Sequence, residues 1–127
     1  MKIRCEHNSI RLRLRKSELA QLRAERWLET AVHFPDGQVF AWEFVLQENL
    51  SEISACFKEG RISVLVPAQQ AQEWMDTNAV GMEQFVPLPK GGSLHLLIEK
   101  DFPCKDRPEE DKTDFFSELA EEAPVKC

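Results

Sequence analysis

The chain repeats one order of secondary structure, and this repeat constrains its fold more than any other feature of the sequence. A strand, a tight turn, a strand, a short helix and a second strand-turn-strand unit are expected over residues 1–48, and the same order recurs over 52–100. The copies share this pattern but few identical residues. Because neither copy can cover its own apolar face, we expect the two to close on each other as one domain.

Local signals place the elements of the first copy. Asn8 can supply the left-handed backbone of a tight turn, and Pro35-Asp36-Gly37 is the strongest turn signal in the chain. Ser17 is expected to accept a hydrogen bond from a free amide at the start of the helix. These signals predict strands at 1–5, 9–15, 27–34 and 38–47 and a helix at 17–26.

The second copy has equivalent signals and completes the predicted architecture. Gly60 suits a short hairpin loop, Pro67 can open a helix, and Pro89-Lys90-Gly91-Gly92 separates the last two strands. Closing such a sheet would remove its exposed edges. The predicted fold is mainly β (α+β), an internally duplicated antiparallel eight-strand barrel or barrel-like sandwich with two short helices. The predicted elements are strands at 53–57, 61–66, 82–88 and 93–100, a helix at 67–75, one domain over 1–104 and an acidic C-terminal tail over 105–127.

The net charge of −6 is unevenly distributed. Residues 1–30 carry eight Lys or Arg against four Asp or Glu, whereas residues 31–100 and 101–127 each carry four against nine. Extensive nucleic-acid binding is therefore not expected, but a local anion site near the N-terminus is possible. No apolar run approaches the ~20 residues that span a bilayer, so we expect no membrane association and a cytoplasmic location.

No motif for catalysis, a metal or a cofactor is present in the sequence. Cys5, Cys56, Cys104 and Cys127 lie far apart without a metal-ligand spacing, and we expect mostly reduced thiols. His33 and His95 are accompanied by no nucleophile motif or paired carboxylates. We therefore predict no catalytic residue, no metal and no cofactor.

Arginines alternate with aliphatic residues along 10–15, so a strand here places them on one face. In one interpretation the aliphatic residues fill the core and the arginines meet solvent and cross-strand acids. In the other, the arginines line a polar cavity or groove and bind phosphate or carboxylate through their planar donors. The candidate binding residues are Arg11, Arg13, Arg15, Glu43 and Glu99.

Two resemblances follow from these segments. The run from Lys2 to Glu18, together with Ile98-Glu99-Lys100-Asp101-Phe102 and Cys104, looks like a small family of uncharacterised bacterial proteins over roughly 1–104. The order strand, helix, three strands, repeated from Ser9 onward, is similar to the duplicated unit of the CYTH-type triphosphate tunnel barrels. Those enzymes hold metal and phosphate with an alternating Glu-x-Glu-x-Lys, where this chain has arginines, which cannot ligate a cation. The resemblance implies a barrel and an anion ligand without the catalytic motif.

The C-terminal segment contains an isolated apolar patch within an acidic stretch. Its apolar residues either dock as a short helix over an open end of the barrel or bind a protein partner, a second copy of the chain included. The candidate partner-binding residues are Phe115, Phe116 and Leu119.

The function expected from the sequence is that of a small, non-catalytic binding or interaction module. Its possible ligands are a small anion or phosphate compound, or a protein partner of the tail. The alternative is a divergent phosphate- or nucleotide-processing enzyme of the tunnel-barrel type, with the arginines as anion ligands. That alternative requires charged side chains in the barrel interior, whereas an interior filled by Ile10, Leu12, Leu14, Val64 and Val66 argues against it.

Overall fold

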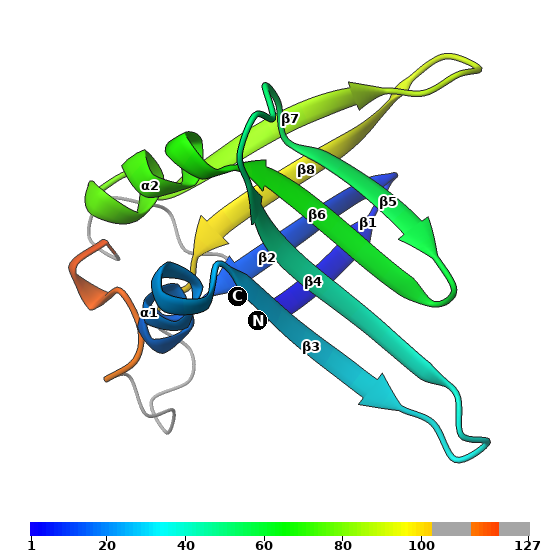
Figure 1. Ribbon diagram of the computed structural model, residues 1–127, viewed down its shortest axis with the longest axis horizontal. Coiled ribbons are helices and arrows are strands. Elements are labelled where there is room, and N and C mark those ends of the chain that lie inside the picture. The colour runs from blue at the N-terminus through cyan, green and yellow to red at the C-terminus, as the bar shows by residue number, and fades with distance from the viewer. Residues whose placement is uncertain (103–112, 120–127) are drawn as a thin grey trace.

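The duplicated order of elements is confirmed by the structure, a computed structural model that describes residues 1–102 and 113–119 (Figure 1). Each half forms two hairpins joined by a helix. The first half contains β1 (Lys2–Glu6), β2 (Ser9–Leu14), α1 (Lys16–Glu25), β3 (Trp27–His33) and β4 (Val39–Gln47). The second contains β5 (Ser54–Lys58), β6 (Arg61–Pro67), α2 (Ala68–Asp76), β7 (Gly81–Pro87) and β8 (Ser93–Lys100). Each of these ten elements lies within one residue of its predicted bounds.

The turns explain why the strands begin and end where they do. The β1–β2 hairpin turns through His7 and Asn8, whose φ angles are 48° and 57°. The β5–β6 hairpin turns through Glu59 and Gly60, whose φ angles are 51° and 74°. A two-residue turn with both φ angles positive matches the right-handed twist of the strands that it joins. The two turns therefore give both copies the same strand register.

Each sheet takes one hairpin from each half of the chain. Sheet A has the strand order β1-β2-β8-β7, and sheet B has the order β3-β4-β6-β5. Strands within a hairpin are antiparallel, but β2 runs parallel to β8 and β4 runs parallel to β6. The two halves are thus interleaved, and neither half contains a complete sheet.

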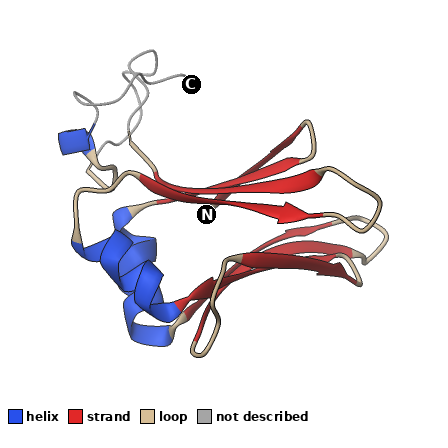
Figure 2. Cartoon of the chain, turned by 90° about the horizontal axis from the view of Figure 1, so that it is seen from above, coloured by secondary structure: helices blue, strands red, loops and turns tan. Residues whose placement is uncertain are grey.

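The two sheets face each other as separate layers (Figure 2). Within 1–102 and 113–119 no strand pairing joins them, so the predicted closed barrel is incorrect and only the less specific two-sheet architecture is supported. The purely antiparallel arrangement is also incorrect. In each half the helix carries the chain from one sheet to the other, and the central strands of each sheet consequently come from different halves and run in the same direction.

The core lies between the inner faces of the sheets. Leu12 and Leu14 of β2 and Ile98 of β8 contribute from sheet A, and Phe44 of β4 and Val64 of β6 contribute from sheet B; all five are almost completely buried. Strand alternation sends the neighbouring odd-numbered residues of β2 to the outer face.

Both helices cover one end of the two-sheet core (Figure 2). Leu19 and Leu22 of α1 and Ala71 and Trp74 of α2 are buried there. Arg26 ends α1 in the left-handed conformation and donates its backbone N–H to the Leu22 carbonyl at 2.8 Å. Neither α1 nor α2, nor the short helix described next, is long and apolar enough to cross a membrane.

The C-terminal segment 113–119 packs against the same end. It contains the 3-10 helix η1 (Ser117–Leu119), and Phe116 and Leu119 belong to the core cluster. Asp114 caps α1, because its carboxylate accepts the Ser17 backbone N–H at 2.8 Å. Ser17 does not occupy the predicted position at the helix start, because α1 begins at Lys16 after the N-cap residue Arg15; the Ser17 hydroxyl donates to Asp114 at 2.6 Å.

Candidate functional site

The arginine alternation places two guanidinium groups on the outer face of sheet A. Leu12 and Leu14 point into the core and are 0% exposed, so Arg11 and Arg13 between them point outward. The aliphatic residues thus fill the core, as the first interpretation expects, and a ligand of the arginines would bind on the outer face and not in a barrel interior. The outward position itself is now established.

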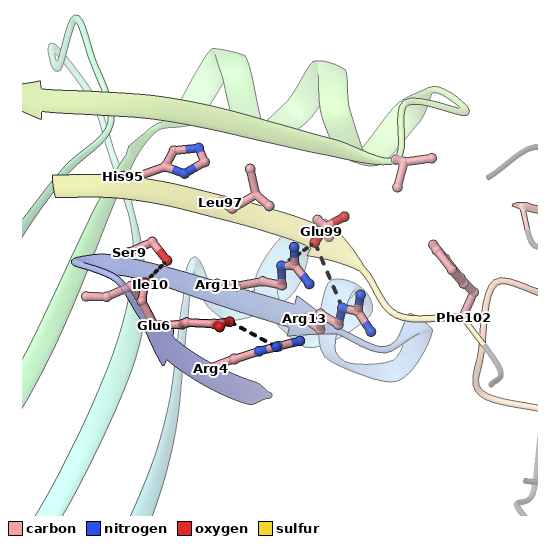
Figure 3. Close-up of a pocket in the computed structure, with 11 residues that line it drawn as sticks. Arg4, Glu6, Ser9, Ile10, Arg11, Arg13, His95, Leu97, Glu99 and Phe102 are labelled. Carbon is pink, nitrogen blue, oxygen red and sulfur yellow. Dashed lines mark hydrogen bonds and ion pairs between the residues drawn. The ribbon is translucent and has the colours of Figure 1, made fainter. Parts of the chain in front are cut away.

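Strand pairing brings further polar groups to the same surface. Arg4 of β1 lies beside Arg11, and Glu99 of β8 lies beside Arg13. Leu97 lies beside Arg11 on the other side. These side chains line a groove of about 520 Å³ on the outer face (Figure 3). We call it the basic groove and define it by Arg4, Arg11, Arg13, His95, Leu97 and Glu99.

Glu99 organises the arginines of the basic groove. Its Oε1 lies 3.0 Å from Arg11 Nε and 3.9 Å from Arg13 Nε. Oε1 is buried and has no hydrogen-bond partner of acceptable geometry within the described residues, so these contacts are mainly charge attraction. Glu6 pairs with Arg4 at 2.9 Å. The described lining of the groove therefore holds three arginines against two glutamates.

The groove has a different chemical character at each end (Figure 3). Phe102 stands at the end near Arg13, whose guanidinium carbon lies 5.9 Å from the centre of the phenyl ring. His95 stands at the opposite end, next to Ser9. The polar centre is thus bounded by flat side chains.

Arg15 does not join the basic groove. Strand β2 ends at Leu14, and the Arg15 guanidinium lies 5.4 Å from the centre of the Phe115 ring. Arg4 takes the third position instead, and the sequence prediction missed it. The signal was available, because the Lys2-Ile3-Arg4 alternation and a two-residue turn at His7-Asn8 together place Arg4 opposite Arg11.

Glu43 also lies outside the groove, on the outer face of sheet B. Its carboxylate accepts hydrogen bonds from Trp27 Nε1 at 2.8 Å, Ser63 Oγ at 2.7 Å and Arg61 Nη1 at 3.2 Å. Burial acts to raise the pKa of Glu43, but these hydrogen bonds and the Arg61 charge outweigh it and lower the pKa. Glu43 is therefore fully engaged with its own sheet, and the structure brings only Glu99 of the two candidate acids to the arginines.

The interior offers no polar tunnel in the part of the chain that the structure describes. Leu12, Leu14, Val64 and Val66 fill it, and Ile10 packs against them. The tunnel-barrel alternative needs inward-facing charges, and its arginines point outward, so its mechanism has no support in this arrangement. Within residues 1–102 and 113–119, no group of three or more His, Cys, Asp and Glu side chains could hold a metal ion.

The candidate partner-binding residues are buried in this structure. Phe115, Phe116 and Leu119 are between 3% and 8% exposed, and they cover the end where Lys100 and Asp101 are buried. A partner could reach them only after segment 113–119 had left this position. Their role in partner binding stays a prediction, and the remainder of the predicted tail lies outside the described residues.

Comparison with known proteins gives one match. The model of a family of unknown function, DUF7009, matches residues 1–119 and so includes both copies of the repeat and the segment that caps α1. No curated protein and no solved structure matches the chain.

Proposed function

Because this chain belongs to the DUF7009 family of unknown function, we propose its role from the geometry of its own surface: it is a non-catalytic binding protein whose basic groove holds a small phosphate-bearing anion. One observation carries the proposal. Three guanidinium groups from the neighbouring strands β1 and β2 gather in one groove of a protein whose net charge is −6. Clustered arginines favour phosphate because their planar donors match its oxygens.

Glu99 leaves much of the donor capacity of these arginines available. A guanidinium has five N–H donors, so the single carboxylate of Glu99, which meets Arg11 Nε at 3.0 Å, cannot occupy all the donors of Arg11 and Arg13. Glu99 also lowers the positive charge of the groove, so binding is expected to be moderate and to weaken as salt increases.

Sheet B serves as an internal comparison for sheet A. Both hairpin turns contain two residues, so Ser9 of β2 corresponds to Arg61 of β6. In the same register Ser63 corresponds to Arg11, and Leu65 corresponds to Arg13. The inner faces of the two strands are equally apolar. The fold thus forms with or without outward arginines at these positions, which supports a role in binding rather than in folding.

The test is a thermal-shift titration with inorganic tripolyphosphate at low salt. The groove variant carries Arg4→Gln, Arg11→Gln and Arg13→Gln. The control variant carries Arg26→Gln, Lys58→Gln and Lys90→Gln, which removes the same charge at positions outside the groove. A ligand at a hundred times its Kd stabilises a fold by about 2.7 kcal/mol, which is easily measured.

We expect tripolyphosphate to stabilise the parent and the control variant but not the groove variant. Equal stabilisation of the two variants would mean that binding depends only on total charge. No stabilisation of the parent would rule out the proposed anion site.

A further inference from the structure

An aromatic pair stands on the same face as the basic groove. The rings of Phe85 on β7 and His95 on β8 are stacked with their centres 4.3 Å apart and their planes 2° from parallel. The Glu83 carboxylate lies 2.8 Å from His95 Nε2 and holds the imidazole in place. Phe85 is nevertheless 56% exposed. A large apolar ring is thus kept at the surface in a defined orientation.

The strand register places this aromatic pair about two residues along the sheet from the arginines of the groove. Phe85, His95 and Ser9 lie side by side on neighbouring strands, and Arg11 comes two residues after Ser9. Two residues of a strand span about 7 Å. His95 and the small Ser9 beside it both line the basic groove. A flat ring resting at this end would have its attached charged group directed towards the arginines.

Sheet B again lacks the corresponding side chains. Ser9 of sheet A pairs with His95, and its counterpart in sheet B, Arg61, pairs with Ala41. Ala41 is therefore the counterpart of His95. Ala31 pairs with Ala41 and is the counterpart of Phe85. The aromatic pair and the outward arginines therefore occur together on sheet A, and both are replaced in the equivalent rows of sheet B.

We propose that the basic groove binds a nucleotide, with its base stacked on the Phe85–His95 pair and its phosphates held by Arg4, Arg11 and Arg13. This inference rests on the proposed anion site and specifies its ligand. Bases stack on aromatic side chains with little dependence on base identity, so the aromatic pair provides affinity for a nucleotide without selecting the base. Hydrogen bonding to the base edge is not part of the proposal.

A single nucleotide fits the site better than a nucleic-acid strand. The groove is bounded at its far end by Phe102, and three arginines surround its centre. Strand binding uses successive aromatic platforms along a continuous positive surface. The net charge of −6 opposes such a surface elsewhere on the protein.

The test compares ATP with inorganic tripolyphosphate by isothermal titration calorimetry. The two ligands have the same number of phosphates and differ in the nucleoside. The stacking variant is Phe85→Leu, with His95→Gln as a second variant. Phe34→Leu is the control, because it alters another exposed phenylalanine away from the groove.

We expect the parent to bind ATP at least tenfold more tightly than tripolyphosphate. Phe85→Leu should weaken ATP binding about tenfold, equivalent to about 1.4 kcal/mol, and leave tripolyphosphate binding unchanged. The control should change neither affinity.

Equal affinity of the parent for ATP and tripolyphosphate would overturn the nucleotide proposal and leave the anion site standing. If Phe85→Leu and His95→Gln each weaken ATP and tripolyphosphate binding by the same factor, the aromatic pair only shapes the groove. That result would also overturn the nucleotide proposal. If neither ligand binds the parent, the anion site itself fails. If a five-nucleotide RNA binds more tightly than ATP, the ligand of the groove is a nucleic-acid strand and the single-nucleotide proposal is wrong.

Discussion

The carboxylate of Asp114 accepts hydrogen bonds from both donors of Ser17, the backbone N–H at 2.8 Å and the hydroxyl at 2.6 Å. The Asp114 carbonyl also accepts the backbone N–H of Lys16 at 3.2 Å. The first turn of α1 is therefore capped by a residue 97 positions away in the sequence. Segment 113–119 is part of the folded unit at this point.

The first prediction concerns this remote cap. Asp114→Ala should lower the free energy of unfolding by about 1 kcal/mol, the usual cost of losing a helix cap. Urea unfolding of Asp114→Ala, Ser17→Ala and the double variant measures the coupling between the two residues. If the two single losses simply add up in the double variant, the contact contributes nothing in solution.

The second prediction concerns Lys100, whose side chain is 3% exposed. Its Nζ donates to the Thr77 carbonyl at 2.5 Å and lies 5.9 Å from the centre of the Trp74 ring and 5.6 Å from that of Phe116. Burial lowers the pKa of Lys100 below the ordinary value of 10.5; Glu118 acts to raise it and Arg23 to lower it further.

The sign of the Lys100 effect follows from proton binding. Between the lowered pKa of the folded state and 10.5, the unfolded chain holds more protons at Lys100 than the folded chain. The contribution of Lys100 to stability therefore rises with pH across this window. Lys100→Met, which keeps an unbranched chain of similar length, should lose that rise. Urea midpoints of parent and variant are compared from neutral pH to 10.5, and parallel curves would contradict the prediction.

The third prediction concerns Glu43 on the outer face of sheet B. The pKa of this carboxyl is lowered from 4.5, so its stabilising effect is present above 4.5 and is lost as the pH falls through the pKa of the folded state. Glu43→Gln should cost about 1 kcal/mol at neutral pH and should make stability less sensitive to acid. Thermal midpoints between neutral and acidic pH test this, with the exposed Glu48→Gln as the control. A variant that loses stability in acid as steeply as the parent would disprove the assignment.

The fourth prediction concerns Gly81, which pairs with Glu99 across β7 and β8. A Cβ atom at this position would lie 2.7 Å from the Ile98 carbonyl oxygen and 3.1 Å from Glu99 Cγ. Gly81→Ala should therefore displace β7 and lower stability by about 1–3 kcal/mol, as overpacking usually does. Urea unfolding measures this change, and an unchanged midpoint would show that β7 can move without cost.

The elements could be predicted from the sequence because their signals are local. The turns at His7-Asn8 and Glu59-Gly60 involve neighbouring residues, and each turn fixes the pairing of its own hairpin. The arrangement of hairpins into sheets could not be predicted in the same way. The pairing of Ser9 with His95 joins residues far apart in the sequence, and no local pattern distinguishes it from the antiparallel closure of a barrel.

The same division holds for the candidate site: the features set by local alternation could be predicted, and those set by pairing between distant strands could not. Alternation along β2 places Arg11 and Arg13 outward, and the structure brings Glu99, also among the candidates, next to both of them. Ligand binding by these residues stays a prediction. Arg15 was included because the alternation continues past Leu14, but the strand does not. The stacking of Phe85 on His95 depends on the β7–β8 register together with ring orientation, and neither is visible in composition.

Interleaving of the two halves has a consequence for how the chain reaches its fold. During synthesis β1 and β2 can pair as a hairpin, but β2 has no second neighbour until β8, about 80 residues later, leaves the ribosome. The unpaired edge of β2 can meanwhile accept β8 from another chain through the same pairing when the protein concentration is high. Exchange of the second half between two chains would rebuild both sheets with every native pairing, so we expect a domain-swapped dimer to be the main misassembled form of this fold.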